Sequence, residues 1–313
     1  MRVGFIGLGN VGGKLSGSLL RNGSELAVHD LNQELVARFV ERGAIAGGSA
    51  AQLMQSCDVV ITCLPSPAAS AAVMDEMLPQ VTAGKIWLEM STTDEAEVKR
   101  LGAAVIAAGG AAVDCPVSGG CHRADTGNIS IFTGCERDTF ERILPLLTKM
   151  GRRILHTGEL GSASVLKVIT NFMATANLVS CAEALTVAKA AGMNLNVAYE
   201  ALKISSGTSF VHETESQVIL NGSRDISFTM DLVAKDIGLF QEVADRAQVP
   251  LELNPLLIAI FQDGISRFGP RELSPNIIKR LEEATGLSIQ APGFPAEMVD
   301  DEPEEPGYEV KVN

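Results

Sequence analysis

Residues 4–20, GFIGLGNVGGKLSGSLL, indicate how the amino-terminal half of this chain folds. Gly7, Gly9 and Gly12 have G-x-G-x-x-G spacing and lie between an apolar run and a helix-like segment. In such a turn the first glycine permits the bend, the second lets a pyrophosphate approach the backbone, and the third lets helix and strand pack closely. A bare G-x-G-x-x-G also occurs in ordinary turns, but the flanking strand and helix favour dinucleotide binding. The residues predicted to contact the dinucleotide are Gly7, Leu8, Gly9, Asn10, Val11 and Gly12.

Asp30 ends the second predicted strand, 18 residues after Gly12. A carboxylate at this place can accept hydrogen bonds from the ribose hydroxyls of an adenosine, and its charge repels a 2′-phosphate. NAD is therefore the predicted cofactor. Arg38 and Arg42 follow on the next predicted helix and make the preference relative, so NADP stays possible.

The remaining pattern predicts an α/β protein: an N-terminal Rossmann doubly wound parallel sheet plus a C-terminal all-α domain, joined by a long interdomain helix. Short apolar runs alternate with helix-like stretches up to about His156, and the early runs are continuously apolar, as buried parallel strands should be. The predicted strands are 3–6, 26–29, 59–64, 86–89, 112–114, 129–133 and 153–155, and the predicted helices of the second half are 165–191, 196–205, 231–247 and 275–285.

The predicted domains are 1–163, 164–292 and an acidic carboxy-terminal tail, 293–313. Residues 297–313 hold seven acidic residues and one basic residue in a stretch rich in Pro and Gly. Such a composition buries little apolar surface, so we expect this tail to be flexible.

Composition excludes several classes of function. The net charge of −13 opposes the cationic face that nucleic acids require. The six cysteines form no C-x-x-C pair and no zinc-like pairing with the four histidines, so no metal site is expected. There is neither a basic leader nor a charge-free apolar run of 18 residues, which predicts a cytoplasmic protein without a membrane partner.

Four separated stretches carry a resemblance to a known family. They are residues 4–20, DCPVSGG at 114–120, GELGSASVLKVITNF at 158–172 and AKDIGLF at 234–240. In order and spacing they resemble the β-hydroxyacid dehydrogenase family, of 3-hydroxyisobutyrate dehydrogenase type, from Met1 to about Leu287.

The resemblance implies roles for particular residues. Ser118, Gly119 and Gly120 would bind the substrate carboxylate through a hydroxyl and backbone amides. Lys167 would be the catalytic residue that exchanges a proton with the substrate oxygen, and Asn171, one helical turn later, would orient substrate and lysine. The family also implies dinucleotide contacts at Leu64, Pro65, Thr92 and Lys235, and Lys235 is followed directly by Asp236. It places Phe210 and Phe228 near the substrate.

The lysine needs a suitable environment for this role. An ordinary lysine has a pKa of about 10.4, poorly matched to neutral pH. Apolar neighbours would have to lower that pKa, or the charged ammonium would act by stabilising the oxyanion. The neighbours that offer apolar surroundings are Val165, Leu166, Val168 and Ile169.

The chain departs from the family pattern in three places. Ala163 replaces a glycine, and Thr170 replaces an asparagine. The third departure is CHRAD at 121–125, where the family has small residues. We hypothesise that His122 or Arg123 engages a second anionic or polar group of the substrate; the alternative is a solvated surface loop.

These features predict an NAD-dependent oxidoreductase. It would transfer a hydride between NAD and the carbinol carbon of a small 3-hydroxy acid, giving a 3-oxo acid or semialdehyde. The alternatives are a semialdehyde or imine reductase on the same scaffold, a 6-phosphogluconate-type decarboxylating dehydrogenase, whose helical domain is much longer, and a non-catalytic NAD-binding redox sensor. The apolar surface of the long helix predicts a homodimer or homotetramer formed through the helical halves.

Overall fold

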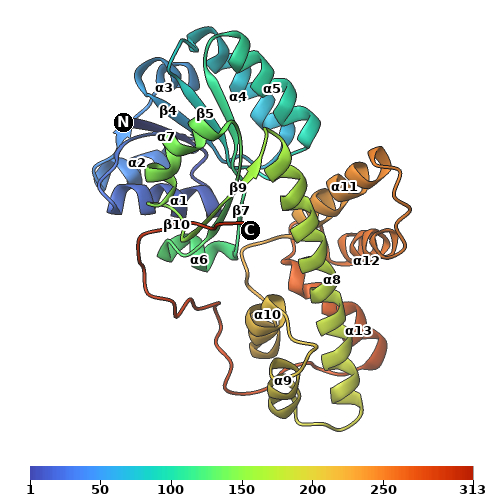
Figure 1. Cartoon of the computed structure of the whole chain (residues 1–313). Helices are drawn as coiled ribbons and strands as arrows, with labels where there is room; N and C mark the ends of the chain where they lie inside the picture. The colour runs from blue at the N-terminus through green and yellow to red at the C-terminus, as the bar shows by residue number, and fades with distance from the viewer. Residues whose placement is uncertain (313) are drawn as a thin grey trace. The chain divides into compact units, whose positions relative to one another are not determined.

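A computed structural model describes residues 1–312 as two compact units (Figure 1). The first unit contains Met1–Lys167 and the segment from Asp301 onward, and the second contains Val168–Asp300. The predicted first boundary, after residue 163, therefore falls four residues early, because the long helix begins within the first unit.

The first unit is built around one mostly parallel sheet, as predicted. Its strand order is β10-β9-β8-β6-β5-β4-β1-β2-β3, with β7 paired to β8. The run from β6 to β3 is parallel, β8 is antiparallel to β6, and β9 and β10 continue parallel to β8. The strands are β1 (Arg2–Ile6), β2 (Glu25–His29), β3 (Ile45–Ala46), β4 (Val59–Thr62), β5 (Ile86–Glu89), β6 (Ala111–Asp114), β7 (Val117–Ser118), β8 (Ser130–Gly134), β9 (Arg153–Gly158) and β10 (Tyr308–Glu309).

Helices cover both faces of this sheet. Successive side chains of a strand point to opposite faces, so the continuously apolar strands serve two cores. In β4, for example, Val59 and Ile61 pack in one hydrophobic cluster and Val60 packs in the other. The helices of this unit are α1 (Asn10–Arg21), α2 (Gln33–Glu41), α3 (Ala50–Ser56), α4 (Pro67–Met77), the 3₁₀ turn η1 (Leu78–Gln80), α5 (Glu95–Ala107), α6 (Gly120–Thr126) and α7 (Arg137–Leu147).

The second unit is helical. Its core contains Leu178 and Leu185 of the long helix together with Ile237, Leu257 and Phe261. The sequence pattern missed α10 and α12. In α10 polar residues interrupt the apolar stripe, and in α12 Pro255 lies in the first turn. The elements are α8 (Ser162–Ala190), α9 (Leu195–Lys203), α10 (Phe210–Asn221), α11 (Met230–Arg246), α12 (Leu253–Phe268), η2 (Ser274–Ile278) and α13 (Lys279–Thr285).

The predicted tail divides between the units: residues 293–300 belong to the second unit, and residues 301–312 belong to the first. Phe294 packs against the helical core, and its carbonyl accepts a hydrogen bond from Asn221 at 2.8 Å. Farther along, β10 adds a parallel strand beside β9 in the first unit (Figure 1). Acidic residues of the segment 301–312 form ion pairs with arginines from distant parts of the sequence. No local sequence pattern reveals these pairs.

Helix α8 is long and apolar enough to cross a membrane by length and composition alone, although 28% of its most apolar window is buried within the chain. Core helices of water-soluble proteins meet the same criteria. Because Leu178, Ala182 and Leu185 belong to the core of the second unit, α8 is accounted for as a packing helix.

Candidate dinucleotide and substrate site

The glycine loop after β1 has the shape that a pyrophosphate requires. Gly7 has φ +96°, and a Cβ there would lie 2.2 Å from the Cys63 carbonyl oxygen. A Cβ at Gly12 would lie 2.0 Å from the Gly7 oxygen. At Gly9, by contrast, a Cβ would meet no atom of the described residues within 4 Å, and the first amides of α1 follow directly. The loop therefore leaves an open cradle at a helix amino terminus, which suits a dinucleotide phosphate.

The other predicted dinucleotide residues of the first unit lie at the same edge of the sheet. Asp30 follows β2, Leu64 and Pro65 follow β4, and Thr92 follows β5. Since β5, β4, β1 and β2 are adjacent and parallel, their carboxyl ends meet at one edge. Asp30 Oδ2 also accepts a hydrogen bond from the Leu8 amide at 2.6 Å, so this carboxylate holds the glycine loop in place.

Sequence reasoning missed two residues that shape this edge. The Ser91 hydroxyl accepts a hydrogen bond from the Leu64 amide at 2.7 Å and thereby joins the loops after β4 and β5. Glu89, almost wholly buried, accepts one from the Ser91 amide at 2.9 Å. Burial raises the pKa of the Glu89 carboxyl above its ordinary value. The only sequence signal was their position directly before Thr92.

The turn predicted to bind a carboxylate joins β7 to α6. Ser118 ends β7, and Gly119 and Gly120 have φ values of +129° and +86°. Only glycine adopts such angles readily, which explains why two glycines follow the serine. The small side chains leave the backbone amides and one hydroxyl of the turn accessible to a carboxylate.

His122 and Arg123 lie on α6, directly after this turn. The Arg123 guanidinium is 3.2 Å from Glu302 in the carboxy-terminal segment, and 22% of its side chain is exposed. An acidic residue of the chain thus pairs with this guanidinium, and the hypothesis that His122 or Arg123 engages a second anionic or polar group of the substrate stays a prediction. The sequence could not show this ion pair, since 179 residues separate Arg123 from Glu302.

Asp114, at the end of β6, fixes the start of α8. Its two carboxylate oxygens accept hydrogen bonds from the amides of Gly161 at 2.9 Å and Ser164 at 2.7 Å. Burial raises the pKa of Asp114, while these hydrogen bonds lower it. Asp114 begins the DCPVSGG stretch, but its role in holding α8 has no signal in the local sequence. It anchors the helix that carries Lys167 one turn later.

Lys167 and Asn171 occupy one face of α8 at i, i+4 spacing. In the second unit, Asn171 Nδ2 donates a hydrogen bond to Asp236 Oδ2 at 2.5 Å, and Lys235 Nζ lies 3.0 Å from Asp236 Oδ1. Asp236 is 1% exposed. The stretches 158–172 and 234–240, which carried the family resemblance, therefore meet at the buried Asp236 carboxylate.

The two phenylalanines expected near the substrate have different surroundings. Phe228 packs against the helical core from the loop that precedes α11. Phe210, the first residue of α10, is 45% exposed.

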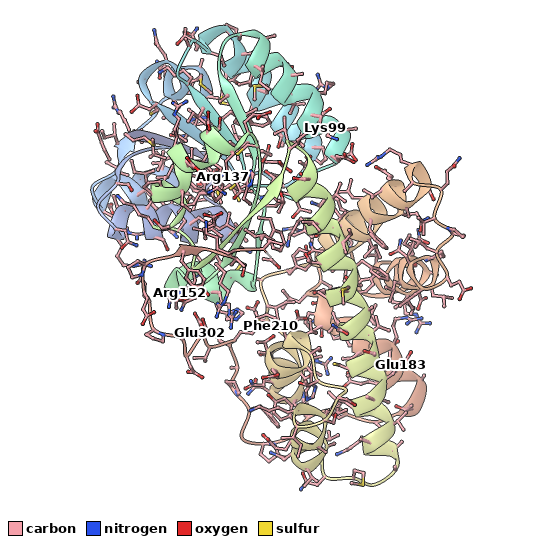
Figure 2. The ribbon with its side chains drawn as sticks, viewed as in Figure 1. Lys99, Arg137, Arg152, Glu183, Phe210 and Glu302 are labelled. Carbon is pink, nitrogen blue, oxygen red and sulfur yellow. The ribbon has the colours of Figure 1, made fainter. Side chains whose placement is uncertain are left out.

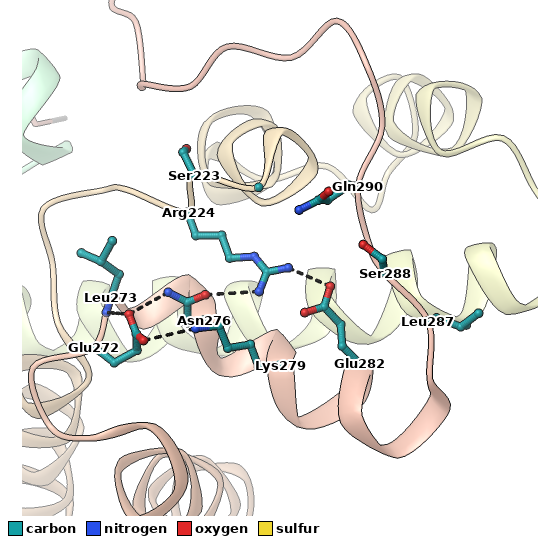
Figure 3. A pocket seen from close by; sticks show the side chains of 11 residues that line it. Ser223, Arg224, Glu272, Leu273, Asn276, Lys279, Glu282, Leu287, Ser288 and Gln290 are labelled. Atoms are coloured by element: carbon teal, nitrogen blue, oxygen red, sulfur yellow. Dashed lines mark hydrogen bonds and ion pairs between the residues drawn. The ribbon is translucent and has the colours of Figure 1, made fainter.

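A cavity of about 540 Å³ opens in the second unit (Figure 3). The buried Arg224 guanidinium crosses it to Glu282 at 2.7 Å, and Lys279 pairs with Glu272 at 3.2 Å (Figure 3). These paired charges join the loop after α10 and the segment before η2 to α13. We therefore interpret this cavity as the surface of a structural ion-pair network.

The fold and the glycine loop define the class: a Rossmann-type protein that binds a nicotinamide dinucleotide. Residues 2–158 match the family described as the NAD binding domain of 6-phosphogluconate dehydrogenase. Residues 161–281 match the one described as NAD-binding of NADP-dependent 3-hydroxyisobutyrate dehydrogenase. The chain belongs to the β-hydroxyacid dehydrogenase family, which confirms the predicted family and fold class.

Individual relatives agree with this assignment. The chain is 31% identical over 293 residues to 2-(hydroxymethyl)glutarate dehydrogenase of Eubacterium barkeri, covering 92% of this chain and 97% of the relative. It is 32% identical over 294 residues to NAD-dependent L-serine dehydrogenase of Pseudomonas aeruginosa, covering 91% and 98%. The crystal structure of 3-hydroxyisobutyrate dehydrogenase from Salmonella typhimurium superposes with a TM-score of 0.81 at 26% identity, covering 90% and 99%. The chain is accordingly an NAD-linked hydroxy-acid oxidoreductase.

Proposed function

We propose that this enzyme oxidises the hydroxyl group of a small 3-hydroxy acid to a semialdehyde or 3-oxo acid, reversibly, with NAD. The observation that carries the proposal is the i, i+4 placement of Lys167 and Asn171 on α8, together with the hydrogen bond that fixes Asn171 to buried Asp236. An amino group and an amide on one helix face supply a proton acceptor and an orienting donor for a substrate hydroxyl.

Each residue has a distinct task in this proposal. The hydroxyl of Ser118 and the amides of Gly119 and Gly120 bind the substrate carboxylate. Asn171 aligns the carbinol group, and Lys167 Nζ accepts the hydroxyl proton as the C–O bond becomes C=O. The bound dinucleotide supplies the hydride acceptor. In the reverse direction Lys167 returns the proton to the oxygen.

The substrates named for the relatives narrow the class. L-Serine, 3-hydroxyisobutyrate and 2-(hydroxymethyl)glutarate share a hydroxymethyl group on the carbon that bears a carboxylate. We therefore infer a substrate of this type, whose oxidation product is a semialdehyde.

We also propose that NAD is preferred to NADP. Asp30 supports this preference, because its carboxylate lies beside the glycine loop, where the adenosine ribose of a dinucleotide binds in this fold. A 2′-phosphate there would meet a like charge.

We propose further that the protein is a cytoplasmic homodimer or homotetramer. Met173 and Val187 on α8 are 58% and 66% exposed, and a second copy would cover such apolar side chains. All six cysteines, each within residues 1–312, are free thiols, which suits a reducing compartment. Light scattering after gel filtration measures the assembly, and a monomeric mass would contradict it.

The activity is tested with a panel of acids and both cofactors. NADH formation should be measured with 3-hydroxyisobutyrate, L-serine, 2-(hydroxymethyl)glutarate and a 2-hydroxy acid as the negative control. We expect turnover of at least one hydroxymethyl acid and a lower KM for NAD than for NADP. Turnover of cyclic imines alone would favour an imine reductase, and dinucleotide binding without turnover would favour a redox sensor.

A further inference from the structure

The carboxy-terminal segment is held on the first unit by main-chain and ionic contacts. The Tyr308 amide donates to the Arg152 carbonyl at 2.9 Å, and the Val310 amide donates to the Ile154 carbonyl at 2.8 Å. A Cβ at Gly307 would lie 2.0 Å from the Gly151 oxygen, so the backbones approach as closely as glycine permits. The ion pairs of the segment, three of whose residues are labelled in Figure 2, are Arg21–Glu304, Arg123–Glu302, Arg137–Glu309, Arg152–Glu305 and Arg153–Glu302.

Glu302 differs from the other acids of the segment because it bridges two arginines. Its Oε1 lies 3.2 Å from Arg123 Nη2, and its Oε2 lies 3.2 Å from Arg153 Nη1. Its backbone carbonyl accepts a hydrogen bond from Asn128 Nδ2 at 2.7 Å. Glu302 is thus fixed through its side chain, by Arg123 within α6, and through its main chain, by Asn128 just after α6.

Arg123 connects this bridge to the turn predicted to bind the substrate carboxylate. A Cβ placed on Gly119 would lie 3.2 Å from Arg123 Cδ and 3.7 Å from Arg123 Cβ. The aliphatic part of Arg123 therefore covers Gly119, and its guanidinium turns to Glu302. A contact chain runs from Glu302 through Arg123 to the carboxylate turn.

We propose that Glu302 is a positioning residue that selects substrates by charge. By neutralising Arg123 beside the carboxylate turn, Glu302 disfavours acids with a second carboxylate and favours monocarboxylates. This inference rests on the proposed function. The physical reason is that an arginine side chain only 22% exposed attracts a substrate anion strongly unless a carboxylate of the protein already pairs with its guanidinium.

Glu302→Gln tests the proposal in the full-length enzyme. The amide keeps the size of the side chain and removes the negative charge that Glu302 places beside Arg123. We expect the ratio of KM for 2-(hydroxymethyl)glutarate to KM for 3-hydroxyisobutyrate to fall about three- to fivefold, which is the size of effect that one partly exposed charge pair produces. The substitution should change KM and leave kcat unchanged.

Two further variants separate this effect from a general loosening of the segment. Glu305→Gln removes an acid that pairs with Arg152, outside the contact chain to Gly119, so its KM ratio should equal that of the wild type. The double variant Arg123→Met with Glu302→Gln should lose the gain for the dicarboxylate. An equal effect of the two glutamine variants, or an unchanged ratio in Glu302→Gln, would overturn the proposal.

A binding measurement distinguishes failure of this inference from failure of the proposed function. If wild type oxidises no hydroxymethyl acid of the panel, the proposed function fails, but the thermal shift that the dicarboxylate and the monocarboxylate each produce with NADH present still reports binding. The increase in Tm caused by the dicarboxylate, relative to the monocarboxylate, should be larger in Glu302→Gln than in wild type. Equal relative shifts, or none in either protein, overturn the role of Glu302.

Discussion

Asn171 and Asp236, 65 residues apart in the chain, are joined by a hydrogen bond of 2.5 Å. The donor lies on α8 one turn after Lys167, and the acceptor is a carboxylate on α11 that is 1% exposed. Because this buried partner restricts the rotamers of Asn171, the amide is held ready to orient a substrate. The pair also binds α8 to α11 within the helical unit.

Lys167→Met should abolish most of the activity and leave dinucleotide binding intact. Methionine is similar in length but cannot accept or return a proton, so we expect kcat to fall about 10²–10⁴-fold, the usual worth of a general acid or base. Steady-state NADH formation measures kcat, and quenching of the protein's fluorescence by NADH measures binding. Wild-type turnover in this variant on every acid that the native enzyme oxidises would refute the role of Lys167.

Gly9→Val should separate cofactor binding from folding. The backbone of Gly9 has φ −66°, which valine adopts, and the space beyond it is free of atoms of the described residues within 4 Å. The added side chain would fill the phosphate cradle, so we expect the affinity for NADH to fall about tenfold or more while Tm stays near the wild-type value.

Gly12→Ala is the matched control for Gly9→Val. The Cβ of an alanine at position 12 would lie 2.0 Å from the Gly7 carbonyl oxygen, so this variant should lower Tm as well as the affinity for NADH. Unimpaired NADH binding by a folded Gly9→Val protein would place the phosphates elsewhere.

Asp30→Asn should weaken the preference for NAD. The amide oxygen can still accept the hydrogen bond from the Leu8 amide, while the charge that opposes a 2′-phosphate is lost. We expect the ratio of kcat/KM for NADP to kcat/KM for NAD to rise about tenfold, as removal of one repulsive charge contact predicts. An unchanged ratio would show that Asp30 supports the loop without discriminating between the cofactors.

Glu89→Gln should change how stability depends on pH. Because burial raises the pKa of Glu89, the folded protein retains a proton that the unfolded chain loses above its ordinary pKa of 4.5. The free energy of unfolding of the wild type should therefore fall as pH rises from 4.5 through the raised folded-state pKa.

Glutamine removes this titration and keeps an oxygen for the Ser91 amide. Urea denaturation at a series of pH values should show the variant gaining stability relative to wild type as pH rises through that window. Parallel curves for the two proteins would mean that Glu89 does not titrate differently in the folded state.

Local sequence patterns were enough to predict the secondary structure of the first unit and the class of its chemistry. Apolar runs predicted β1 and β5 to within one residue of their observed bounds, because a buried parallel strand needs only consecutive apolar side chains. The glycines of the first loop were equally informative, since each satisfies a steric need within a few residues.

The contacts that fix the candidate site join distant parts of the chain and become visible in the folded protein. Asp114 holds the start of α8, Asp236 holds Asn171, and Glu302 occupies Arg123, in each case across 47 or more residues. The acidic tail was predicted to be flexible because its own composition cannot form a core. In the first unit, arginines between residues 21 and 153 pair with acidic residues of this segment, and periodicity carries no information about such distant charge pairing.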